Sequence, residues 1–171
     1  MNTIQGLMRV VTLFTGFMVA LGLFTSQAHA RDLQGRLGLG YNAQFANYRE
    51  TGGVPAIAGK YAFTNDLALE GIVGVATSTP GNSVFGVKFF KNLFFETNLN
   101  FYSFVGVALV AANNRSSSNI QGGFGTEFFI PGLESLGLSM ELGAELTGIS
   151  GSTVLRTLGI SFLHAGMRFY F

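Results

Sequence analysis

The last eight residues of the chain alternate between two kinds of side chain, and no other feature constrains the fold as strongly. One parity is apolar or small and carries Ala165, Met167, Phe169 and Phe171. The other parity carries His164, Gly166, Arg168 and Tyr170. Successive side chains of a β-strand point to opposite faces, so this period predicts a strand with one apolar and one polar face. We expect a strand that ends on an aromatic residue where the final strand of a barrel closes against the first.

The same alternation recurs between short polar connections along the chain. It predicts strands at about 33–45, 54–63, 67–77, 84–90, 93–109, 120–130, 136–146 and 155–171. Tight turns are expected near Asn65, Asn92 and Gly132, and polar loops near Glu50, Gly81, Ser117 and Gly151. Eight strands joined by hairpins predict an all-β fold, an eight-stranded antiparallel up-and-down barrel.

Residues 1–30 have the composition of a secretory signal peptide. Arg9 supplies a positive charge, an apolar run follows it, and an Ala-His-Ala sequence ending at Ala30 fits a cleavage site. Threonines and glycines interrupt the apolar run, which is also short for a membrane-spanning helix. We therefore expect cleavage after Ala30 and a single mature domain, residues 31–171.

The charged residues of the mature chain avoid the apolar parity of every predicted strand. Charged residues make up only 11% of the whole chain. The polar parity carries ten of them: Arg36, Lys60, Glu70, Lys88, Glu96, Glu127, Glu141, Glu145, Arg156 and Arg168. A lysine or arginine that faces lipid costs about 2–4 kcal/mol at the membrane midplane, so the pattern favours a transmembrane barrel with a polar interior. Soluble barrels also alternate, but the predicted signal peptide, the C-terminal phenylalanine and the scarcity of charge favour the membrane.

Five basic and five acidic side chains inside one barrel predict a network of ion pairs in the lumen. His164, the only histidine after the predicted signal peptide, lies on the same parity and joins this predicted network. An eight-stranded barrel is just wide enough for its side chains to fill, and inward glycines leave room for long ones, so we expect a filled core and no open pore. The expected pairs are Lys60 with Glu70, Lys88 with Glu96, and Arg168 with Glu127 or Glu141.

Aromatic residues collect beside the three predicted turns and the C-terminus. They are Phe63, Phe89, Phe90, Phe94, Phe95, Phe128, Phe129, Phe169, Tyr170 and Phe171. Aromatic girdles mark the membrane interfaces of transmembrane barrels. The cluster therefore predicts that both termini and the short turns face the periplasm, while the loops face outward.

The ending Gly-Met-Arg-Phe-Tyr-Phe resembles the C-terminal signal of bacterial outer-membrane barrels, with Gly166, Phe169 and Phe171 carrying the likeness. With the alternation, the mature chain resembles the small eight-stranded barrels of the OmpA-barrel and OmpX-like class. The resemblance implies an integral protein of the bacterial outer membrane that contacts outer-membrane lipids and is placed there by the barrel-insertion machinery. We expect a monomer without enzyme activity that contributes to envelope integrity, or alternatively a narrow channel for ions or small solutes.

Little in the sequence favours catalysis or a bound cofactor. The chain has no cysteine, no metal-ligand spacing and no excess of basic residues, so we expect no metal, no cofactor and no nucleic-acid partner. A lipid-modifying barrel would need a histidine with a serine or an acid in reach. Glu145 could approach His164, but Ser161 has the opposite parity, and the histidine lies mid-wall. Short loops argue against a role in adhesion.

Overall fold

The computed structural model describes residues 32–42, 56–76, 81–112, 115–149, 152–157 and 164–171. The expected signal peptide, residues 1–30, lies outside these ranges. Within them, no helix is long and apolar enough to cross a membrane.

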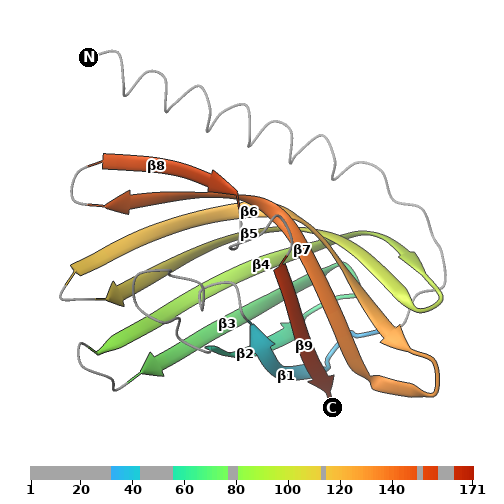
Figure 1. Cartoon of the computed structure of the whole chain (residues 1–171). Coiled ribbons are helices and arrows are strands. Elements are labelled where there is room, and N and C mark those ends of the chain that lie inside the picture. The colour runs from blue at the N-terminus through green and yellow to red at the C-terminus, as the bar shows by residue number, and fades with distance from the viewer. Residues whose placement is uncertain (1–31, 43–55, 77–80, 113–114, 150–151, 158–163) are drawn as a thin grey trace.

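The described residues form one closed antiparallel barrel (Figure 1). Its strands are β1 (Leu37–Asn42), β2 (Ala56–Ala62), β3 (Leu67–Ala76), β4 (Asn82–Glu96), β5 (Leu99–Ala112), β6 (Arg115–Ile130), β7 (Leu133–Ile149), β8 (Ser152–Thr157) and β9 (His164–Tyr170). Each strand from β1 to β7 pairs with the next one in the sequence, and β9 pairs with β1, which closes the barrel. β8 and β9 both pair with β7, along successive stretches of it, and therefore share one strand position in the barrel. We call each strand position a stave, and the barrel has eight staves. The predicted fold class is confirmed.

The last stave is divided where the sequence predicts one continuous strand. Ala144 of β7 lies opposite Thr157 of β8, and Glu141 lies opposite His164 of β9. Three steps along β7 thus correspond to seven steps along the last stave. The prediction of an unbroken strand over 155–171 is therefore wrong. The last stave has four extra residues, and because four is an even number the alternation of apolar and polar residues continues unchanged and does not reveal the division.

The turn between β4 and β5 lies six residues later than the sequence indicates, at residues 97–98 in place of 91–92. The predicted turn at Asn92 is a bulge within the β4–β5 pairing, and the strands continue to Glu96 and Leu99. The Lys91 ammonium binds Asp66 at 2.9 Å, and the Asn92 side chain donates to the Asn65 carbonyl at 2.7 Å. These polar residues therefore brace the neighbouring β2–β3 turn, which explains why they resemble a turn in the sequence.

The first strand also begins later than predicted. The sequence pattern starts it at Leu33 with that side chain outward, but β1 starts at Leu37, and Gln34 and Gly35 form a turn. Gly35 has a φ of 77°, which is accessible to glycine and reverses the alternation. As a result Leu33 is buried inside the barrel, with 3% of its surface exposed.

The apolar parity faces outward along the described wall, as predicted. On β7, Met140 is 54% exposed, whereas Glu141 beside it is 1% exposed. The aromatic cluster divides in the same way, since Phe90, Phe129 and Tyr170 are buried inside the lumen and not part of an outer girdle. The prediction was wrong for these three because it followed position along the chain and ignored parity.

We call the end with the β2–β3, β4–β5 and β6–β7 turns the turn end, and the opposite end the loop end. The turn end also holds Phe171, whose backbone amide donates to the Leu37 carbonyl at 2.9 Å. Figure 1 shows the C-terminus beside β1 at this end.

Candidate functional site

Six charged side chains meet inside the barrel near its turn end, and we call them the charged layer. They come from six different strands, and each is at most 3% exposed. The members are Lys60, Glu70, Lys88, Glu127, Glu141 and Arg168. With three cations and three carboxylates, the layer has no formal net charge.

Ion pairs connect strands that are distant in the sequence. Arg168 of β9 contacts both Glu70 of β3 and Glu127 of β6. Lys60 binds Glu127 at 2.8 Å, and Lys88 binds the sixth member of the layer, Glu141. Lys60 lies opposite Glu70 in the β2–β3 register, as the sequence indicates, but its ammonium crosses the lumen to a carboxylate on the far wall.

Hydroxyl groups make further hydrogen bonds with the carboxylates and the guanidinium of the layer. Such additional hydrogen bonds help a buried ion pair offset the loss of solvation of its charges. The Tyr170 hydroxyl donates to Glu127 at 2.7 Å, and the Tyr102 hydroxyl donates to Glu141 at 3.0 Å. The Arg168 guanidinium donates to the Ser139 hydroxyl at 3.0 Å. The sequence pattern alone does not identify these three partners as functional. Their parity was the available signal, because all three lie on the inward face of predicted strands.

An aromatic ring lies among the cations of the charged layer. The centroid of the Phe90 ring is 4.6 Å from the Lys60 ammonium, 5.3 Å from that of Lys88 and 5.8 Å from the Arg168 guanidinium. Phe104 lies 4.3 Å from the Lys88 ammonium. Cation–π contacts of this kind are strongest where water is excluded. The lumen is therefore filled at this level by rings as well as by ion pairs.

Glycines on the inward face make the space that these large side chains occupy. A Cβ at Gly125 would lie 2.7 Å from the Tyr102 ring, and one at Gly38 would lie 2.7 Å from the Tyr170 ring. A Cβ at Gly106 would lie 2.8 Å from the Lys88 chain. These distances are well inside van der Waals contact, so the glycines complement the bulky side chains opposite them.

The loop end of the lumen has a different lining. Its buried apolar residues are mostly small: Ala56, Ala58, Ile72, Val84, Ala108 and Val110. Across from them β6 carries Asn119 and Gln121, each 2% exposed. Neither oxygen of these two amides has a hydrogen-bond partner, nor has the Gln121 nitrogen. Among the described residues, the fully buried side chains of this half include neither a charge nor an aromatic ring, although Glu145 lies half-buried opposite Gln121.

Three described side chains of the predicted network, Arg36, Glu96 and Glu145, are not buried in the charged layer. Glu96 is exposed beside the β4–β5 turn, so its expected pair with Lys88 does not form. Arg36 and Glu145 are half-buried, and Glu145 accepts a hydrogen bond from the Thr147 hydroxyl at 3.5 Å. The side chains of Arg156 and His164 lie outside the described part of the structure. Their backbones pair with Glu145 and Glu141 respectively.

The residues of the predicted insertion signal lie beside β1 and β7. Phe169 and Phe171 face outward, and their rings meet edge to face with centroids 5.2 Å apart. Gly166 lies opposite Ser139 of β7, and a Cβ there would lie 2.7 Å from the serine hydroxyl. The absence of a side chain at Gly166 thus leaves room for the serine hydroxyl that binds Arg168.

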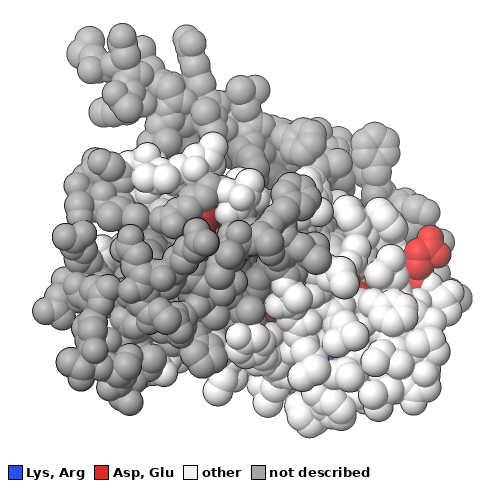
Figure 2. Space-filling model, in the orientation of Figure 1, with Lys and Arg blue, Asp and Glu red and all other residues white. Residues whose placement is uncertain are grey.

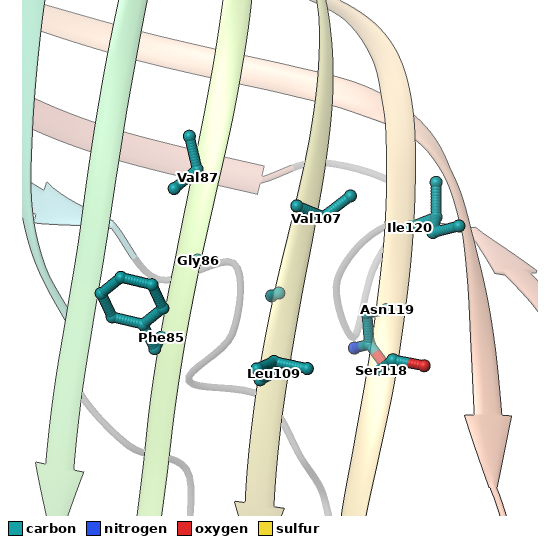
Figure 3. Close-up of a pocket in the computed structure, with 9 residues that line it drawn as sticks. Phe85, Gly86, Val87, Val107, Leu109, Ser118, Asn119 and Ile120 are labelled. Carbon is teal, nitrogen blue, oxygen red and sulfur yellow. The ribbon is translucent and has the colours of Figure 1, made fainter.

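The outer wall carries a shallow hollow across β4, β5 and β6 (Figure 3). It has a volume of about 430 Å³, and its sides are formed by Phe85, Val87, Val107, Leu109 and Ile120. Figure 2 shows that white atoms dominate the described part of this view and that the largest group of charged atoms, which is acidic, lies at one edge. The hollow holds no titratable group. Among the described residues, no cluster of histidine and carboxylate side chains could hold a metal ion.

No protein-family model, curated protein or solved structure matches this chain. The function must therefore be inferred from the geometry of the barrel.

Proposed function

We propose that this chain is an integral barrel of the bacterial outer membrane whose lumen is closed, and that it strengthens the envelope without catalysing a reaction. The observation that carries the proposal is the inversion of the wall: apolar side chains cover the outside, and buried ion pairs lie inside. Exposed apolar areas larger than a few hundred Å² mark surfaces that contact a membrane or another protein. An apolar belt around every described stave fits lipid better than one protein partner.

The outward position Val107 tests the membrane placement. Its side chain is 56% exposed, so Val107→Arg in a protein surrounded by water should change stability by no more than about 0.5 kcal/mol. In a bilayer the same substitution should cost about 2–4 kcal/mol. The measurement is urea-induced unfolding in phospholipid vesicles. Leu133→Arg, at an exposed position beside the β6–β7 turn, is the matched control and should cost about 0–1 kcal/mol.

Localisation and biogenesis follow from the same proposal. A signal peptide of residues 1–30 directs export and is removed, and the insertion machinery reads Gly166, Phe169 and Phe171. Outer-membrane lipids surround a monomer that binds no cofactor or metal. Deletion of Phe171 should abolish the heat-modifiable gel migration of the membrane fraction, whereas Phe63→Leu at another exposed aromatic position should retain it. Equal recovery of folded protein without Phe171 would contradict this role of the C-terminus.

A narrow channel is the second candidate, and the small residues and unpartnered amides of the loop end favour it. The charged layer argues against it, because a permeating ion would have to separate buried pairs. Recordings from purified protein in planar bilayers distinguish the two functions. A closed barrel should give a flat baseline, whereas steady openings that change in Lys88→Ala would establish a channel.

A further inference from the structure

The aromatic layer at the turn end is incomplete on one side. Its rings are Phe90 from β4, Tyr102 and Phe104 from β5, Phe129 from β6 and Tyr170 from β9. The β2–β3 side contributes only Ala62 and Ala68, which lie opposite each other in the strand register. Two methyl groups cannot span the lumen as rings do, so these strands alone would leave a gap in the layer.

Leu33 fills this gap, although it belongs to no strand. It is 3% exposed and packs in the same buried cluster as Ala62, Ala68 and the five rings. The turn at Gln34 and Gly35 carries it inward from the start of β1.

Hydrogen bonds hold this turn in place. The Gly35 amide donates to the Ala62 carbonyl at 2.8 Å, and the Arg36 amide donates to the Leu33 carbonyl at 3.0 Å. The Gln34 amide donates to the Asp32 carboxylate at 2.8 Å. The segment is thus a built structure whose register on β2 fixes the position of Leu33.

We propose that residues 32–36 are a stopper that seals the turn end of the lumen, with Leu33 as the side chain that completes the seal. The inference rests on the proposed closed barrel and identifies the part of the chain that closes its mouth. Because only a short turn carries the stopper, it can leave while the strand pairing of the wall remains intact. The charged layer lies directly behind it, with Lys60 only two residues from Ala62 on the same face of β2.

Cysteine reactivity tests the stopper, because the chain has no cysteine of its own. Ala62→Cys places one thiol behind Leu33, and Ala108→Cys places a second, reference thiol in the loop half. Each is made in the full chain, folded in micelles, and labelled with a small neutral thiol reagent. Leu33→Ser should speed labelling at position 62 at least tenfold and leave position 108 within twofold. Leu37→Ser, at an outward-facing position of β1, is the matched control and should change neither rate.

A filling substitution separates loss of the seal from loss of the fold. Ala68→Leu should restore slow labelling of position 62 in the Leu33→Ser protein, because it returns volume to the same gap. Unchanged labelling of position 62 in Leu33→Ser, with heat-modifiable migration intact, would overturn the stopper. Faster labelling at both positions would also overturn it, because it indicates general loosening. These outcomes do not depend on membrane placement, which the Val107→Arg experiment decides separately.

Discussion

The two halves of the lumen share one wall but are filled by different chemistry. At the turn end, six charged side chains and several rings pack against one another around Phe90. At the loop end, small apolar side chains face two amides on β6. The same alternation generates both halves, so alternation specifies which side chains point inward but not how well they pack. Among the described residues, the buried ion pairs and the buried rings lie in the turn half.

Glu127→Gln should have the largest effect, because this carboxylate pairs with Lys60 and Arg168 and accepts from Tyr170. Removing one partner of a buried ion pair costs about 3–5 kcal/mol, since the remaining charge stays buried. Urea unfolding in vesicles measures the loss. Glu96→Gln, the same exchange at an exposed position, should stay within about 0.5 kcal/mol. Equal effects at the two positions would remove the distinction between the charged layer and the surface.

Gly125→Ala should cost about 1–3 kcal/mol, because its Cβ would lie 2.7 Å from Tyr102 and 2.8 Å from the Met140 carbonyl. Gly71→Ala is the control, since a Cβ there meets nothing within 4 Å. That change should be neutral or stabilising by up to about 1 kcal/mol. The midpoint of urea unfolding reports both variants. A stable Gly125→Ala protein would show that the turn half is loosely packed.

The cation–π contact between Lys88 and Phe104 should give a coupling energy of about 0.5–2 kcal/mol in a double-mutant cycle. The cycle combines Lys88→Met with Phe104→Leu. The free energy of unfolding is measured for the parent protein, the two single variants and the double variant. Lys91→Met with Phe104→Leu serves as the reference cycle, because the Lys91 ammonium binds Asp66 at the turn end. Similar coupling in both cycles would exclude a specific contribution from the ring.

Ile72→Val should have the smallest effect, about 0.5–1.5 kcal/mol, which is usual for removing one buried methyl group. Ile72 is fully buried in the loop half but makes no ion pair. A loss as large as that of Glu127→Gln would mean that the loop half contributes as much to stability as the charged layer.

The sequence predicts the eight staves and the inward charges well, because alternate residues of each strand face the outside and the lumen and differ in polarity. It fails where backbone geometry changes without changing that pattern. The four-residue offset between β8 and β9 preserves parity, and the bulge near Asn92 has the composition of a turn. The positive φ of Gly35 reverses Leu33 in a way that hydrophobicity cannot indicate.

The sequence predicts which residues belong to the candidate site better than it predicts the contacts between them. Strand register follows from hairpins, so the position of Lys60 opposite Glu70 could be read from the sequence. The choice of Glu127 as the partner of Lys60 depends on reach across the lumen, which only the closed barrel defines. Phe90 is misplaced because the sequence pattern assigns it to an aromatic girdle. Tyr102 is placed correctly on the inward parity, but its partner Glu141 cannot be read from parity alone.

The pairing of β1 with β9 has a consequence for the order of assembly. These are the first and last strands of the barrel, and contacts so distant in sequence form late because they close the longest loop. Until His164 and the residues after it arrive, β1 has hydrogen-bonding groups exposed along one edge. Such an edge readily pairs with other chains. Any shielding of this edge would therefore matter most in the interval before the seven residues of β9 become available.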